Sequence, residues 1–176
     1  MKYIVNEKNK INLAFDLAKE MVVNNLEPLF LCVGTDKVIS DSIAPIVATL
    51  LKHKYKITSK VIGDLIYNIN AHNLKKAVTE IKEKYPKNTI ILIDSTIGNI
   101  EDLGDVIFKK GGSIAGGLNG HKEKVGDYSI LGISSCYGVT NKTLLNGTRL
   151  SLILKMANFI ADAINFSNVL KNNVFN

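Results

Sequence analysis

Pro28–Gly34, with the sequence PLFLCVG, is the stretch that decides the fold. It is a short unbroken apolar run, which is typical of a β-strand buried on both faces. Before it, residues 10–25 carry apolar side chains at helical spacing, and Pro28 stops that helix from continuing. After it, a polar loop leads to Asp41–Leu51, where helical spacing resumes. The opening of the chain therefore predicts helix, strand, loop and helix.

The same alternation repeats further along the chain. Residues 57–63 and 89–93 favour strands, and residues 71–84 between them favour a helix. Residues 128–133 predict another strand and residues 143–163 a long final helix. Alternating strands and helices imply parallel strands joined by right-handed crossovers. We therefore expect an α/β fold with a mostly parallel sheet.

Glycine interrupts this pattern between Ser95 and Gly126, which predicts a long irregular loop with a short strand at Val106–Phe108. The length of 176 residues fits one domain. We expect that domain to span 1–176, with a core at about 10–165 and a polar tail, 166–176, that frays.

Composition narrows the classes of function. The net charge is +6, but it comes almost entirely from scattered lysines, with Arg149 as the only arginine. Nucleic-acid readers concentrate arginine and interleave aromatic residues, so no nucleic-acid partner is expected. No apolar run reaches about 18 residues and the N-terminus lacks a signal-peptide core, so we expect a cytoplasmic protein without a membrane partner. Neither Cys32 nor Cys136 has zinc-ligand spacing, and no metal or other cofactor is expected.

Acidic residues follow the predicted central strands. Gly34 allows a tight exit from the first strand, and the loop after it carries Asp36 and Asp41. Asp94 follows the strand at 89–93. Ligand sites of open α/β sheets lie at this edge. If Asp41 and Asp94 converge there, like charges raise one pKa, and the pair can activate water by general acid–base catalysis.

Structural roles for these acids stay open beside the catalytic one. Asp41 fits an acid that caps a helix, whereas Asp36, Asp64 and Asp94 fit turn residues. Asp64 comes directly after the strand predicted at 57–63, so it can lie at the same edge of the sheet. His121, in the glycine-rich loop, is a further candidate for the site.

Several separated motifs stand out along the chain: Cys32–Asp36 followed by Asp41–Pro45, then Ile93–Ser95, Val125–Asp127 and, near the C-terminus, Thr148–Leu150. Together these motifs resemble the YyaC-like sporulation proteins. The resemblance covers roughly residues 10–165. It implies a three-layer α/β/α sandwich of the phosphorylase/hydrolase-like kind, with a central mixed sheet.

More distantly, the Gly34–Pro45 loop and Asp94 look like the two aspartate regions of the spore germination protease, an atypical aspartic protease that degrades small acid-soluble spore proteins. By this likeness Asp41 and Asp94 match its catalytic aspartates. Hydrogenase-maturation endopeptidases show a similar opening, in which both acids bind a metal together with a histidine. The matching stretch here, Ser113–Gly117, has no histidine, and His121 matches only loosely.

The resemblance and the residues together predict a sporulation-associated endopeptidase with Asp41 and Asp94 as the catalytic pair. Substrate binding is assigned to five further residues: Gly34, Thr35, Asp36, Ser95 and Arg149. The expected partner is a protein or peptide, with small spore proteins as the first candidates, and a homo-oligomer is left open. Two alternatives are a catalytically silent binding or regulatory module and a metal-dependent maturation endopeptidase.

Overall fold

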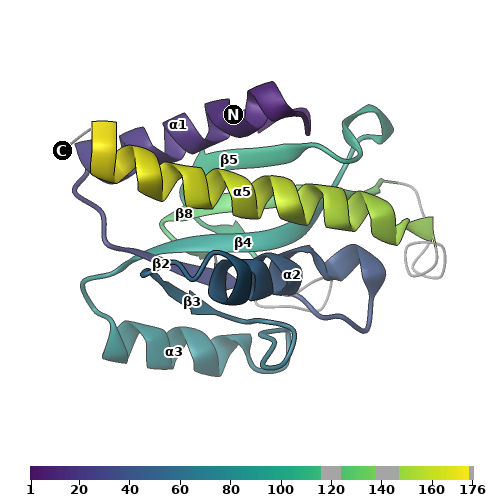
Figure 1. Cartoon of the computed structure of the whole chain (residues 1–176). Coiled ribbons are helices and arrows are strands. Elements are labelled where there is room, and N and C mark those ends of the chain that lie inside the picture. The colour runs from purple at the N-terminus through teal and green to yellow at the C-terminus, as the bar shows by residue number, and fades with distance from the viewer. Residues whose placement is uncertain (116–123, 138–146, 175–176) are drawn as a thin grey trace.

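The computed structural model describes residues 1–115, 124–137 and 147–174. Figure 1 shows the arrangement of the chain. The helices, strands and short helical turns (η) are β1 (Lys2–Tyr3), α1 (Glu7–Val23), β2 (Pro28–Cys32), η1 (Ile39–Asp41), α2 (Ile43–Thr49), η2 (Leu50–Lys54), β3 (Lys60–Ile62), α3 (Leu74–Lys84), β4 (Thr89–Gly98), η3 (Ile100–Asp102), β5 (Val106–Lys110), β6 (Ser113–Ile114), β7 (Lys124–Val125), β8 (Tyr128–Cys136) and α5 (Leu150–Val174).

Six strands form one sheet in the order β1-β5-β8-β4-β2-β3. β2 pairs in parallel with β3 and β4, and β4 pairs in parallel with β8. β5 runs antiparallel to β8, and β1 runs antiparallel to β5. The predicted mostly parallel mixed sheet is confirmed. The chain passes from β2 to β3 on one side and then crosses to β4 on the other, so the carboxyl ends of β2 and β4 form a topological switch point, where ligands bind in open sheets.

Helices cover both faces of this sheet. On one face, α1, α2 and α5 pack on inward-facing residues such as Phe30 and Ile93, and α5 lies beside both α1 and α2 (Figure 1). On the other face, Leu74 of α3 and Val125 of β7 pack with Leu92 of β4. Side chains alternate along a strand, so odd-numbered residues of β4 face α5 and even-numbered ones face α3. This is the expected three-layer sandwich.

The glycine-rich region holds more regular structure than its composition predicts. β4 continues to Gly98, where it pairs with β8, and β5 is a full member of the sheet. The hairpin of β6 and β7 forms a second, two-stranded sheet. Pairing with neighbouring strands outweighs the low strand propensity of glycine here, because those backbone groups gain partners only in the folded sheet.

The final helix ends later than the sequence predicts. α5 continues to Val174 and includes most of the segment in which fraying is expected. Ser167 is fully buried, Leu170 packs against the core, and Lys171 Nζ donates to the Leu26 carbonyl oxygen over 3.2 Å. These contacts hold the polar-looking end of the helix in place. The expected start of this helix, at residues 143–146, lies outside the described residues.

One helical segment among the described residues, Leu150–Asn173, is long and apolar enough to cross a membrane by length and composition alone. Half of its most apolar window is buried inside the protein. Its packing against α1 and α2 is that of a core helix, so this segment is weak evidence for a membrane span.

Candidate functional site

The loop that carries Asp41 is held tightly against the end of β2. Gly34 donates its backbone N–H to the Ile69 carbonyl oxygen over 2.7 Å, and Thr35 donates to the Asp41 carbonyl oxygen over 3.0 Å. Gly34 has a φ of +152°, and a Cβ at this position would lie 2.1 Å from that same Asp41 oxygen. Only glycine fits such a close approach of two backbone segments. Gly34 therefore fixes where Asp41 sits.

Asp41 ends η1, a short turn that lies over β4 and β8 beside α5. Its side chain is partly buried, and burial raises the pKa of the carboxyl group above 3.8, its ordinary value. Hydrogen bonds from the Ser95 hydroxyl and the Thr35 backbone N–H oppose this effect without cancelling it. The neutral, proton-carrying form of Asp41 is therefore favoured relative to a solvated aspartate.

Ser95 connects the two predicted catalytic acids. Its Oγ donates to Asp41 Oδ1 over 2.9 Å, and its backbone N–H donates to Asp94 Oδ1 over 2.7 Å. Asp94 is only 4% exposed and follows Ile93, the residue that pairs with Cys32 at the end of β2. Beyond that point β4 has no β2 partner, so Asp94 lies at the switch point.

The two carboxyl groups approach Ser95 from different sides of β4. Ser95 shares its face with Ile93, which packs in the core between the sheet and α5. Asp94 shares its face with Leu92, which packs in the core between the sheet and α3. The sequence predicts that both acids lie at one edge of the sheet. The alternation of side chains along β4 then places Ser95 between the two carboxyl groups.

Asp64 lies at the neighbouring strand end in a different setting. Its carboxylate accepts hydrogen bonds from Lys52 Nζ at 2.5 Å and from the backbone N–H groups of Ile66 and Tyr67. Burial alone would raise the pKa of Asp64, but Lys52 and the two backbone donors outweigh it and lower the pKa. These three donors occupy both oxygens and assign Asp64 a structural role, as a turn residue. Nothing in the sequence indicates that Lys52 pairs with Asp64.

The remaining predicted site residues are spread around this edge. Asp36 is exposed, and Thr35 Oγ1 accepts a hydrogen bond from the Lys37 backbone N–H over 3.3 Å. Arg149 precedes α5 and lines a cavity of about 460 Å³ together with Ser134 and Lys155. Asp41 and Asp94 are not among the described residues of that cavity. The cavity that Arg149 lines is therefore not the one that holds the two carboxyl groups.

The structure also describes the cysteines and two of the histidines. Cys32 is fully buried, and burial raises the pKa of its thiol well above the ordinary value, as expected of a core residue. His53 and His72 are exposed on the surface, whereas His121 lies outside the described residues. Within the described part of the chain, no group of three or more histidine, cysteine, aspartate or glutamate side chains is placed to hold a metal ion.

Residues 1–163 match a protein family described as "Protein of unknown function (DUF1256)". The chain belongs to this family. A curated relative is the "Uncharacterized protein YyaC" of Bacillus subtilis (strain 168), which is 29% identical over 137 residues. That match covers 77% of this chain and 67% of the relative. The resemblance seen in the separated motifs is thereby confirmed at the level of the family, and neither description states an activity.

Proposed function

We propose that this protein is a peptide hydrolase that uses Asp41 and Asp94 as its acid–base pair. The observation that supports this best is Ser95, which donates one hydrogen bond to each carboxyl group. A raised pKa suits Asp41 to the role of proton donor. The buried Asp94, at the switch point between β2 and β4, is then the base that accepts a proton from water.

In the proposed reaction, water attacks the scissile carbonyl carbon while Asp94 takes one of its protons. A C–O bond forms, and the C–N bond breaks as Asp41 gives its proton to the leaving nitrogen. The hydrogen bond from Ser95 Oγ to Asp41 Oδ1 holds this carboxyl group in position. The loop residues Thr35 and Asp36 and the more distant Arg149 contact the peptide around the scissile bond.

The resemblance to the spore germination protease supplies the substrate class for this proposal. We propose that the substrates are small acid-soluble spore proteins and that the protein acts in the cytoplasm of the sporulating cell or spore. The family description and the uncharacterized relative are compatible with this assignment and do not specify it.

The test is incubation of the purified chain with small acid-soluble spore proteins, read by mass spectrometry. Asp41→Asn and Asp94→Asn are run in parallel, with Asp127→Asn as a matched control. Asp127 is an exposed aspartate at the opposite end of β4, where its Oδ2 accepts from the Ile90 backbone N–H. Defined fragments that persist in the control and fall by at least about 100-fold in both site variants support the proposal. Fragments that survive both site substitutions refute it.

A second candidate function is a binding or regulatory module without catalysis. It is favoured by the hydrogen bond that the Ser95 backbone N–H donates to the Asp94 carboxylate. A carboxylate that accepts a hydrogen bond from the next residue's backbone stabilises the end of a strand without any catalytic role. In that case the wild type yields no fragments, and the two asparagine variants differ from it only in stability. The metal-dependent alternative predicts that purified protein retains Ni²⁺ or Zn²⁺, which elemental analysis measures directly.

A further inference from the structure

A second cavity lies on the α3 face of the sheet, next to Asp94. Its volume is about 270 Å³, and it lies between the end of β4, β5 and the hairpin of β6 and β7. Thr96 and Leu131 form part of its lining. Leu131 is the register partner of Asp94 on β8, and Thr96 follows Asp94 on the same face of β4. The cavity therefore adjoins the carboxyl group that we propose as the base.

Ser113, at the start of β6, also lines this cavity. Its residue is only 8% exposed, and its Oγ is the one buried side-chain polar atom in the described structure without a hydrogen-bond partner. A buried hydroxyl normally finds a partner, since a buried polar group without a hydrogen bond destabilises the fold. This hydroxyl is thus a donor that a ligand in the cavity can satisfy.

Two lysines add positive charge at the same place. Lys109 of β5 and Lys124 of β7 both line the cavity, and both are exposed at its rim. In the part of the chain that the structure describes, no carboxylate forms an ion pair with either. Gly112 fixes the geometry, because a Cβ there would lie 2.5 Å from the Val125 carbonyl oxygen. The hairpin that carries Ser113 and Lys124 is therefore closely packed at its base.

We infer that this cavity binds an oxyanion, with the Ser113 and Thr96 hydroxyls as hydrogen-bond donors and Lys109 and Lys124 as the cationic rim. The oxyanion is the carboxylate of an acidic peptide segment or a free phosphate. This inference concerns binding alone, and it stands or falls independently of hydrolysis. If the proposed function also holds, the cavity selects acidic side chains within a few residues of the scissile bond.

The test is titration of the ¹⁵N-labelled chain, followed by amide chemical shifts. Three probes are added separately: a short neutral-ended peptide with one central glutamate, the same peptide with glutamine, and inorganic phosphate. Saturable shifts centred on the amides of Thr96, Gly112 and Ser113 are expected with the glutamate peptide, with phosphate, or with both, and they identify the source of the anion. Equal binding of the glutamine peptide, or no saturable shift at these amides with either anion, overturns the inference.

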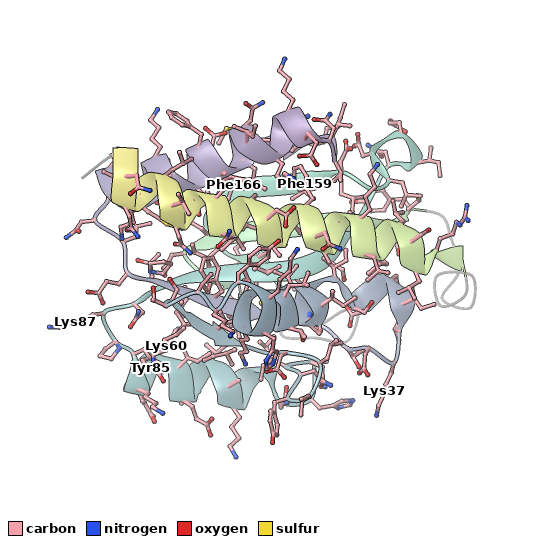
Figure 2. All side chains as sticks on the ribbon, in the orientation of Figure 1. Lys37, Lys60, Tyr85, Lys87, Phe159 and Phe166 are labelled. Carbon is pink, nitrogen blue, oxygen red and sulfur yellow. The ribbon has the colours of Figure 1, made fainter. Side chains whose placement is uncertain are left out.

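Variants separate the contribution of the hydrogen-bond donors to anion binding from that of the surrounding positive charge. Ser113→Ala should weaken anion binding by about tenfold, as for loss of a charge-assisted hydrogen bond. Lys124→Gln should weaken it by roughly twofold to fivefold, since exposed charges are screened. Lys87→Gln is the matched control, because Lys87 lies just before the start of β4, whereas Thr96 lines the cavity near the other end of this strand, and Figure 2 shows Lys87 at the outer edge of the molecule. Unchanged affinity in both Ser113→Ala and Lys124→Gln, or an equal loss in Lys87→Gln, contradicts the assignment.

Discussion

Asp41 and Asp64 lie at the same edge of the sheet, yet their surroundings shift their pKa values in opposite directions. Asp64 receives one lysine and two backbone N–H donors, and its pKa is lowered. Asp41 receives a serine hydroxyl and a backbone N–H, and burial still raises its pKa. Position at a strand end therefore does not decide in which direction the pKa of an acid shifts. Burial and the donors around each carboxyl group decide it.

Gly34 and Gly63 hold the segments around the two acids in place, and replacing either glycine should have the largest effect that we predict. A Cβ on Gly34 would lie 2.1 Å from the Asp41 carbonyl oxygen, and a Cβ on Gly63 would lie 2.0 Å from the Cys32 carbonyl oxygen. Both glycines also have positive φ values. Gly34→Ala and Gly63→Ala should each lower the free energy of unfolding by at least about 3 kcal/mol, through strain and backbone displacement. Urea unfolding measures this, and a loss under about 1 kcal/mol in either variant would show that the loop can move aside.

The second largest effect is the difference in stability between the asparagine variants of the two acids. Asp64→Asn removes the charge that Lys52 and two backbone donors satisfy, so it should destabilise the fold by about 2 kcal/mol at pH 7. Asp41→Asn should leave stability within about 1 kcal/mol of the wild type or raise it slightly, because ionised Asp41 is disfavoured in the folded state. Urea unfolding of both variants at one pH decides between these outcomes. Equal destabilisation would mean that both acids are structural.

The sequence was sufficient for the central strands and for the two acids at their ends. Unbroken apolar runs mark β2 and β4 because parallel strands are buried on both faces. The two-residue strands β1, β6 and β7 are too short to show any alternation, and their pairing depends on distant partners. The Lys52–Asp64 ion pair likewise depends on how α2 and η2 return to β3. Tertiary contacts of this kind leave no local pattern.

The geometry of the candidate site could be predicted only in part, for the same reason. Asp41, Asp94 and Ser95 all come from segments that the motifs single out, and the structure connects them through Ser95. The orphaned hydroxyl of Ser113 carries no such signal, because a serine in a glycine-rich segment is indistinguishable from a turn residue. Only the fold shows that it is buried beside β4.

The pH dependence of stability should also differ between the acids. Asp64 has a lowered pKa, so its contribution is present above 3.8, its ordinary value, and is lost as the pH falls through the folded pKa. Asp41 has a raised pKa, so the folded state binds a proton more readily than the unfolded chain, and stability declines as the pH rises from 3.8 through the folded pKa. The gap between wild type and Asp64→Asn should therefore shrink in acid. Asp41→Asn should gain relative to wild type between pH 4 and 7. Unfolding midpoints measured from about pH 2 to 7 test both signs, because the Asp64 window lies below 3.8 and the Asp41 window above it, and parallel curves for the two variants would contradict them.

The smallest predicted change concerns Ser95 itself. Ser95→Ala removes the hydroxyl that donates to Asp41 Oδ1 but keeps the backbone N–H that donates to Asp94 Oδ1. It therefore breaks the hydrogen bond to one acid and leaves the hydrogen bond to the other. Stability should fall by only about 1 kcal/mol, the usual value of one hydrogen bond. The pKa of Asp41 should rise further, because the Ser95 hydroxyl is the strongest influence that opposes burial. Carboxyl ¹³C chemical shifts of Asp41 followed against pH report this directly. A rise in the Asp41 pKa, with Asp64 unchanged as an internal control, would show that Ser95 tunes one acid of the proposed pair; an unchanged Asp41 pKa would mean that the hydroxyl has no influence on its protonation.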